Sequence, residues 1–401
     1  MRAFPEDTLV LRSRLLRPSE TARPTWAEVD LDALAHNAAI VRRTVAPSRL
    51  LAVVKADAYG HGSVPVARHL EAEGLADAFG VAQAEEGFEL REAGVRAPIL
   101  VLNGVFGGAY REVLEASLTP VVFDPGQLEA FARAAGSRGF DYHLKLDTGM
   151  GRLGLLPERL EGFLRTASRF PAARMTGLLT HFARADEADP RPTLEQLARF
   201  QHLLARIRAA GHRPLTVHAA NSAAALAFPE SRMDMVRVGL ALYGYVPGAT
   251  PPPGPLRPVM RWVSRIVALR RLPAGAPIGY GGRYRTSREA SIATVPVGYA
   301  DGLPRRLEGC GEALVGSRRC PLVGAVSMDL ITVDVTDVPS AAPGDEVVLL
   351  GRQGSVSLDA DTVAEAADTI AYEILTAVGR RVPRIYRDPH RAGEKRTPRE
   401  P

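Results

Sequence analysis

Eight short apolar runs alternate with longer segments whose apolar residues recur at helical spacing, such as 31–45 and 194–211. Nearly continuous apolar runs are typical of strands in a parallel sheet that helices cover on both faces. The runs span residues 50–56, 79–82, 98–104, 118–123, 141–148, 175–183, 215–221 and 235–244. Eight repeats in roughly 220 residues favour a closed (β/α)8 barrel. An open doubly wound sheet is less consistent, because no GxGxxG follows the first run.

A stretch rich in proline, residues 246–259, marks a change of character along the chain. Proline continues neither a helix nor a ladder, so this stretch predicts a stiff linker. Beyond it, short β-branched runs between Gly, Pro and Asp turns predict a small antiparallel domain, with a helix over 360–375. We predict an α/β fold: a TIM-like barrel over 24–250 and a mainly β C-terminal domain over 251–387. A flexible extension (1–23) and a disordered basic tail (388–401) complete the prediction.

The charge of the chain gives no sign of a nucleic-acid partner. The formal net charge is +5, and from Arg380 onward eight Lys or Arg face three acids. The surplus therefore resides in the C-terminal tail, and no basic stripe remains elsewhere.

Neither a membrane span nor a secretory signal is visible in the sequence, so we expect a cytoplasmic protein without a membrane partner. The two cysteines, Cys310 and Cys320, lack the companions of a metal site, and we expect two reduced thiols and no metal.

Polar residues occur where the predicted strands end, and this end of a barrel carries the functional loops. Lys55 closes the first strand in AVVKADAYGHG. A lysine amine at the end of a buried strand has a lowered pKa and forms Schiff bases readily, although a lysine that simply reaches solvent fits the pattern too. Tyr59 and the glycines at 60 and 62 suggest a loop that admits a close ligand.

The fifth strand ends in KLDTGMGRLG, which contains Lys145 and Asp147. Gly149 and Gly151 permit a tight turn that presents Arg152. An arginine held in this way is a plausible carboxylate clamp, since its planar fork matches a carboxylate.

The last three strands end in further polar residues: His181, then Asn221 and Ser222, then Arg237 and Gly239. Ser222 opens a predicted helix, where a serine is either a cap or a phosphate ligand. Arg237 inside an apolar strand requires partners, and a ring nitrogen is a suitable acceptor. A phosphate site, a Schiff-base lysine and two arginines together predict pyridoxal phosphate and an amino-acid substrate.

The ordered motifs resemble those of alanine racemases over about residues 24–387. AVVKADAYGHG is similar to the cofactor-lysine signature of that family, and KLDTGMGRLG, THFA, HAANSAA and VRVGLALYG follow in order. PIGYGGRYR, VGYADGLPR and SMDLITVDV are similarly placed in the second domain. The resemblance implies a homodimeric enzyme that uses pyridoxal 5'-phosphate to interconvert L- and D-alanine for peptidoglycan.

The resemblance also implies a role for each matching residue. Lys55 binds the cofactor covalently and is the base for D-alanine, and Tyr280, from the other subunit, is the base for L-alanine. The implied cofactor contacts are Tyr59, Ser222 and Gly239 to phosphate, Arg237 to the pyridine nitrogen, and His181 between Arg237 and the tyrosine. The implied substrate residues are Arg152 and the Met328 N–H for the carboxylate, with Lys145, Asn221, Tyr299 and Asp329 in support.

Two positions depart from the family pattern. Arg380 stands where the family often has a tyrosine that touches phosphate, and Ser327 stands where many relatives have cysteine. Lys145 matches a position at which the family often carries a carbamylated lysine.

Three other interpretations stay open from the sequence. A racemase of serine or of several amino acids would share these motifs, and a decarboxylase can be built on the same barrel. A non-catalytic pyridoxal-phosphate carrier would have no use for a second base, which Tyr280 supplies.

Overall fold

The computed structural model describes residues 23–387, so residues 1–22 of the predicted extension and the predicted tail lie outside the described residues. The chain divides into two compact units. One comprises Ala33–Arg257, and the other joins the segment up to Asp32 with the chain from Pro258 onward. Among residues 23–387, no helix is long and apolar enough to cross a membrane.

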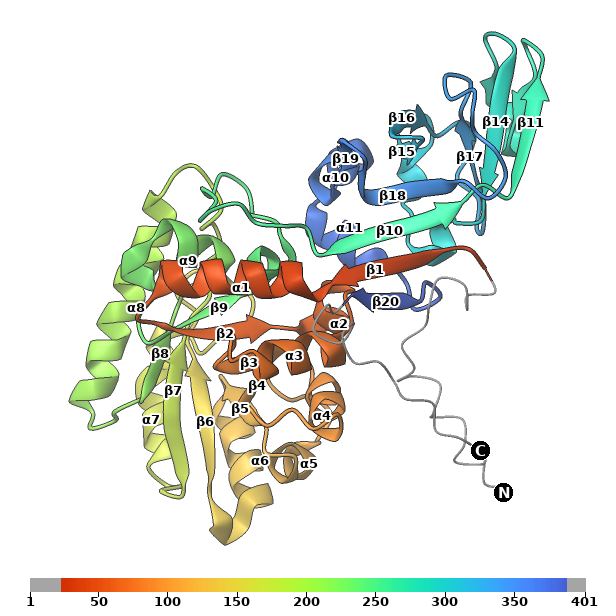
Figure 1. Cartoon of the computed structure of the whole chain (residues 1–401). Helices are drawn as coiled ribbons and strands as arrows, with labels where there is room; N and C mark the ends of the chain where they lie inside the picture. Colours follow the sequence, from red (N-terminus) through yellow and green to blue (C-terminus); the bar gives the residue numbers. More distant parts are fainter. Residues whose placement is uncertain (1–22, 388–401) are drawn as a thin grey trace, which may run out of the picture. The chain divides into compact units, whose positions relative to one another are not determined.

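The first unit is the predicted eight-stranded barrel (Figure 1). Its strands pair in parallel in the order β8-β7-β6-β5-β4-β3-β2-β9. All eight predicted strands are confirmed: β2 (Arg49–Val53), β3 (Ala78–Val81), β4 (Ile99–Val101), β5 (Thr119–Val122), β6 (Phe140–Lys145), β7 (Ala173–Leu179), β8 (Thr216–His218) and β9 (Met235–Val238). Their residues are almost all buried, which explains why the sequence shows continuous apolar runs rather than alternation.

Helices alternate with the strands along the chain, as in a (β/α)8 barrel. They are α1 (Leu31–Val45), α3 (Ser63–Ala72), α4 (Ala84–Glu92), α5 (Tyr110–Glu115), α6 (Pro125–Ala135), α7 (Leu160–Ala167), α8 (Arg191–Ala209) and α9 (Ser222–Ala227). A short element, α2 (Lys55–Tyr59), comes directly after β2 and is not a right-handed helix.

The barrel is nearly closed rather than fully hydrogen-bonded around its circumference. β8 and β9 stand at the two ends of the strand order and share no ladder. Two backbone hydrogen bonds bridge this seam, from Asp234 N to Val217 O (3.1 Å) and from Arg237 N to Ala220 O (2.9 Å). The carboxylate of Asp234 also accepts from Val217 N at 2.7 Å. The loops after the eight strands therefore converge at one end of the barrel.

The second unit is mainly β, as predicted. Its largest sheet contains β1 (Trp26–Asp30), β10 (Met260–Arg265), β15 (Glu312–Val315), β16 (Arg318–Pro321), β18 (Glu346–Gln353), β19 (Val356–Leu358) and β20 (Arg384–Arg387). A three-stranded sheet contains β11 (Ala268–Leu272), β14 (Ala290–Val295) and β17 (Ile331–Asp334), and β12 (Pro277–Ile278) pairs with β13 (Tyr284–Arg285). The predicted helix over 360–375 is two helices, α10 (Ala360–Ala367) and α11 (Ala371–Ala377). Asp368 separates them in a left-handed conformation, with a φ of 55°.

Two predicted boundaries differ from the units. Residues 24–32, which we assigned to the barrel, belong to the second unit, because β1 pairs with β10 and β20. The strand pattern of WAEVD is local, whereas the choice of its partners is made by the tertiary structure. The boundary predicted at 250/251 lies at 257/258, because the proline-rich stretch remains attached to the barrel.

Asn37 of α1 makes that attachment. Its fully buried side chain donates to Leu242 O (3.0 Å) and Arg257 O (2.7 Å) and accepts from Arg257 N (2.8 Å). One amide thus satisfies both backbone groups of Arg257, at the end of the linker, and the carbonyl of Leu242, which precedes the linker.

Asn37→Ala should lower the free energy of unfolding of the barrel by about 2–3 kcal/mol, because it leaves buried backbone groups unpaired. Urea unfolding of the full chain measures this loss. Asn103→Ala is the matched control, since Asn103 makes no side-chain hydrogen bond among residues 23–387. Equal unfolding midpoints for the two variants would contradict the anchoring role of Asn37.

Candidate functional site

The structure gathers the predicted barrel residues at the end where the strands point their carboxyl termini. Lys55 follows β2, Lys145 ends β6, His181 follows β7, and Ser222 and Gly239 follow β8 and β9. Because the strands are parallel, these five positions share one end of one sheet. The structure therefore brings the predicted residues of the barrel unit to the strand ends, and their roles stay predictions.

Lys55 is carried by a left-handed turn. The four residues after it have positive φ angles: Ala56 (52°), Asp57 (54°), Ala58 (52°) and Tyr59 (55°). Each non-glycine residue in this region costs roughly 1–2 kcal/mol, so surrounding contacts must hold the turn in place. Such strain is concentrated at functional sites, and it could not be predicted from the sequence because Ala and Tyr rarely adopt this conformation.

Several hydrogen bonds hold this turn. Asp57 Oδ1 accepts from Ser63 N at 2.8 Å, and His61 Nδ1 lies 2.9 Å from Ala58 O. The ring of His61 stacks on Tyr243 with centroids 4.5 Å apart, and the Tyr243 hydroxyl donates to Val53 O at 3.0 Å. The end of β2 and the turn are thus fixed from both sides.

The loop after β6 presents Arg152, as predicted. Asp147 Oδ1 accepts from the N–H groups of Gly149 (2.9 Å), Met150 (2.8 Å) and Gly151 (3.2 Å). Burial is the largest single influence on the pKa of Asp147 and raises it, but the backbone hydrogen bonds together outweigh burial and lower the pKa below its ordinary value. The Arg152 side chain is exposed and makes no hydrogen bond or ion pair within the described part of the chain. Its guanidinium is therefore available to an anionic ligand.

Arg237 lies buried inside β9, with 4% of its surface exposed, and its Nη atoms are surrounded by acceptors. Nη1 donates to His218 O (2.9 Å) and lies 3.1 Å from His218 Nδ1. Nη2 donates to Thr180 O (2.6 Å) and Ala219 O (2.9 Å) and lies 3.3 Å from His181 Nδ1.

Burial lowers the pKa of Arg237 to about 10, which still leaves it protonated at pH 7. The Nε–H of Arg237 has no acceptor among residues 23–387. A neutral ring nitrogen at this position would complete the guanidinium's hydrogen bonds.

Positive charge dominates the rest of the site. Burial first, and then the charges of Arg237, Arg152 and Lys55, lower the pKa of Lys145 to about 8. Burial and Arg152 lower the pKa of Lys55 as well. Burial and four surrounding cations hold the pKa of His181 well below its usual range, so its imidazole is neutral at pH 7. The site therefore suits a ligand with anionic groups.

A cradle without side-chain bulk lies beside the lysine turn. The Gly239 N–H donates to Ser222 Oγ at 2.9 Å, and a Cβ on Gly239 would lie 2.3 Å from the Tyr59 hydroxyl. A hydroxyl from Tyr59, a hydroxyl from Ser222 and a backbone N–H thus converge where only glycine fits. The sequence left Ser222 open as a helix cap, but the cap is Asn221, whose side chain accepts from Ala224 N at 3.0 Å. Ser222 Oγ is instead directed to Gly239.

The remaining predicted residues belong to the other unit and are described within it. Tyr280, Tyr299, Met328 and Asp329 are all exposed, Tyr280 to 75%. Tyr299 and Met328 are neighbours, because the N–H groups of Tyr299 and Ala300 donate to Ser327 O and Met328 O at 3.0 Å each. Arg380 is exposed ahead of β20.

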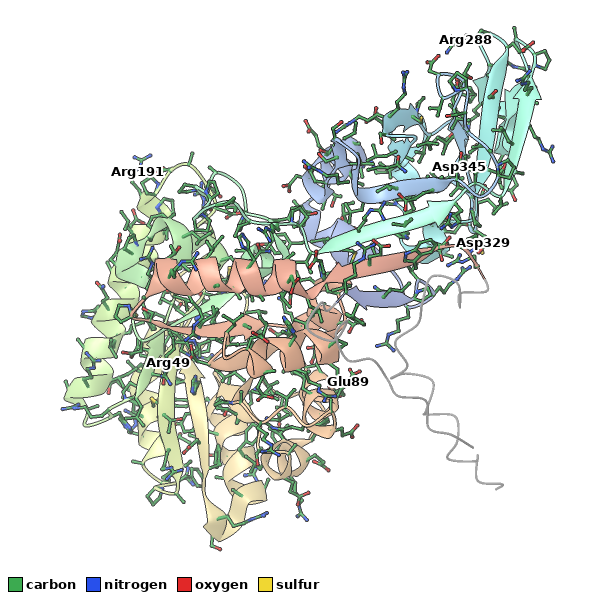
Figure 2. All side chains as sticks on the ribbon, in the orientation of Figure 1. Arg49, Glu89, Arg191, Arg288, Asp329 and Asp345 are labelled. Carbon is green, nitrogen blue, oxygen red and sulfur yellow. The ribbon has the colours of Figure 1, made fainter. Side chains whose placement is uncertain are left out.

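Charged residues fix the loop that carries Asp329, which Figure 2 labels. Arg381 donates to Asp329 at 2.6 Å and lies 3.6 Å from Asp301. Asp301 is fully buried and also accepts two bonds from Arg23, at 2.7 and 2.9 Å. The turns with Tyr299 and Met328 are thus tied to the domain through ion pairs.

Sequence reasoning missed several residues of the site. His218 and Thr180 bond Arg237 directly, and His143 Nδ1 lies 2.9 Å from His218 Nε2. Glu86 lies beside Lys55 and acts to raise its pKa. A signal in composition was available for the lysines: the chain contains three, Lys55, Lys145 and Lys395, against many arginines. Two of the three stand in this site.

Comparison with known proteins agrees with this arrangement. The family models "Alanine racemase, N-terminal domain" and "Alanine racemase, C-terminal domain" match residues 29–247 and 259–386. The chain belongs to the alanine racemase family.

Relatives with that name match nearly the whole chain. The alanine racemase of Sorangium cellulosum is 47% identical over 380 residues, covering 92% of this chain and all of its own. That of Symbiobacterium thermophilum is 46% identical over 368 residues, covering 91% and 97%.

Solved alanine racemases share the fold as well. The enzyme of Bacillus anthracis, with bound L-Ala-P, has a TM-score of 0.87 at 37% identity and covers 92% of this chain and 96% of its own. That of Streptomyces lavendulae has a TM-score of 0.87 at 37% identity, covering 92% and 98%. The chain thus has the fold of alanine racemases from end to end of the described residues.

The lowered pKa of Lys145 can be measured by chemical labelling of amines. The chain has three lysines, so the labelled Lys145 peptide is easily distinguished by mass spectrometry. Acetic anhydride reacts with neutral amines only, so labelling of Lys145 in carbon-dioxide-free buffer should rise with a midpoint near pH 8. Below that pH the amine is protonated and unreactive. A lysine peptide added to the same solution provides the ordinary midpoint. An equally high midpoint for Lys145 would show that burial and the nearby cations do not lower its pKa.

Proposed function

We propose that this protein interconverts L-alanine and D-alanine with pyridoxal 5'-phosphate bound at the barrel mouth. The observation that carries the proposal is that Lys55 follows β2, the strand paired with β9, and that β9 carries the buried Arg237, whose Nε–H has no acceptor among the described residues. An amine for the aldehyde and a donor for a ring nitrogen are what this cofactor requires.

The residues present fit the cofactor at three further atoms. The hydroxyls of Tyr59 and Ser222 and the N–H of Gly239 would hold the phosphate, because they converge beside a position where a Cβ has no room. Arg237 would donate to the pyridine nitrogen without giving up its proton. When bound, the cofactor supplies an electron sink for the pair left at the substrate Cα as its proton is removed.

Proton transfer is the task of two side chains on opposite faces of the substrate. Burial and Arg152 lower the pKa of Lys55, so that its amine releases a proton near neutral pH more readily than an ordinary lysine. Lys55 would exchange the proton of D-alanine, and the Tyr280 phenol that of L-alanine. His181, 3.3 Å from Arg237, would connect the arginine to the phenol and keep it oriented.

The substrate carboxylate requires cationic and N–H donors. Arg152 is presented by the Asp147 loop with no other partner among residues 23–387, and the N–H of Met328 would add a backbone donor. Lys145 would support Arg152, and its low pKa favours the neutral amine that a carbamate requires. Asn221, Tyr299 and Asp329 would shape the surroundings of the substrate.

A homodimer follows from the same proposal, with Tyr280 of one copy serving the barrel of the other. The exposure of Tyr280, Tyr299, Met328 and Leu330 on the C-terminal unit supports it, since exposed apolar residues in neighbouring turns mark contact surfaces. We place the enzyme in the cytoplasm, in the supply of D-alanine for peptidoglycan. The two unpaired thiols, Cys310 and Cys320, support a reducing compartment.

Two variants test the proposal by separating the bases. Lys55→Ala should abolish the covalent cofactor adduct that borohydride makes permanent. Tyr280→Phe should keep that adduct and slow proton removal from L-alanine by about 10²- to 10⁴-fold, the usual worth of a positioned base. Mass spectrometry locates the adduct, and chiral chromatography follows racemisation.

Tyr284→Phe is the matched control, since Tyr284 lies four residues on and packs against the local core. Normal racemisation in both directions by Tyr280→Phe would refute the two-base assignment. A panel that includes serine, with assay of released carbon dioxide, distinguishes a broader racemase or a decarboxylase from the proposed enzyme.

A further inference from the structure

Glu86 joins the lysine turn to the neighbouring strand. One carboxylate oxygen, Oε1, accepts from the N–H of Ala56, the residue directly after Lys55, at 2.6 Å. The other, Oε2, accepts from the N–H groups of Ala82 (2.7 Å) and Gln83 (3.1 Å). Glu86 lies in the first turn of α4, so a single side chain connects the end of β2 with the end of β3.

This connection acts on a strained segment. Ala56 is the first of four residues with positive φ, and its N–H donates to the Glu86 side chain instead of to a helix carbonyl. Charge-assisted bonds to a carboxylate are about twice as strong as neutral ones. The bond from Ala56 N therefore offsets part of the cost of the left-handed turn at the residue next to the amine.

Glu86 also supplies negative charge in a region of cations. Arg152 acts on Lys55 to lower the pKa of the amine, and Lys145 and Arg237 lie in the same cluster. Glu86 acts on Lys55 in the opposite direction. Without Glu86, only burial and the nearby cations would act on the pKa of Lys55, and both lower it.

We propose that Glu86 is a positioning residue for Lys55, which fixes the backbone next to the amine and balances the positive charge around it. The inference rests on the proposed function, because it assigns Lys55 the covalent and proton-transfer work. Glu86 itself touches neither substrate nor cofactor in this account.

Three variants of the full-length chain test the two parts of this role. Glu86→Gln keeps a carbonyl acceptor and removes the charge, whereas Glu86→Asp keeps the charge and is too short to span both strands. Glu89→Gln is the control, because Glu89 is exposed on the same helix one turn on (Figure 2) and its carboxylate makes no hydrogen bond among the described residues.

The readout is the rate at which each chain, freed of cofactor, forms the borohydride-trapped adduct with pyridoxal phosphate at Lys55 from pH 6 to pH 10. That rate rises as the amine loses its proton, so its midpoint follows the pKa of Lys55. Glu86→Gln should move the midpoint to lower pH, because the negative charge that favours the protonated form of Lys55 is lost. Glu86→Asp should leave the midpoint in place. Both should lower kcat by about 10-fold or more with a smaller change in KM, because the reacting amine is displaced.

The inference is overturned if Glu86→Gln matches Glu89→Gln in midpoint or in kcat. Should Glu86→Gln fail to fold, Glu86→Asp decides alone: wild-type kcat refutes the inference, and a lower kcat at an unchanged midpoint supports it. Failure of the proposed function has a different signature. In that case the wild-type chain itself forms no adduct at Lys55.

Discussion

The hydrogen bonds of the Arg237 guanidinium to three carbonyl oxygens are the interaction on which fold and site both depend. β8 and β9 share no ladder, so the barrel has a seam. From β9, Arg237 donates to the carbonyls of Thr180, His218 and Ala219. Thr180 directly follows β7, His218 ends β8, and Ala219 directly follows β8. The Nε–H of the same cation has no acceptor among residues 23–387. A buried charge is tolerable there only because these acceptors surround it.

The concentration of positive charge follows from this arrangement. Once a permanent cation is fixed in the centre, each nearby amine and imidazole has a lower affinity for protons. Lys145 and His181 show this effect together with that of burial. At pH 7 the His181 imidazole is therefore neutral, whereas Lys145, with a pKa of about 8, remains largely protonated and helps to attract anionic groups. A positively charged site suits an enzyme that acts on an amino acid, because it attracts the carboxylate of the substrate.

The sequence predicted the parts of the protein that local pattern and motif determine. The barrel strands are nearly continuous apolar runs, and Lys55, Arg152 and Arg237 stand out because charge at a strand end or inside a strand is rare. The assignment of β1 to the second unit could not be predicted, because strand pattern says nothing of which strand will pair with it. The left-handed turn was also hidden, since Ala56 and Ala58 carry no preference for positive φ.

Residues that act through others were the hardest to find. Glu86 looks like an ordinary helix-start acid, and His218 like one more strand residue, until the fold brings them to Ala56 and Arg237. Their roles depend on contacts between segments far apart in the chain, such as His218 with His143. Asn221 and Ser222 show the same limit on a smaller scale: adjacent positions both suit a cap, and only geometry assigns the cap to Asn221.

The central claim is that the proton at Cα of alanine is removed from one face and returned to the other. Incubation of L-alanine with the purified protein and pyridoxal phosphate in heavy water tests it most directly, with mass spectrometry after chiral separation. The account predicts that D- and L-alanine approach equal amounts and that the D-alanine carries deuterium at Cα. L-alanine that stays unchanged, or that is lost without the appearance of D-alanine, would contradict it.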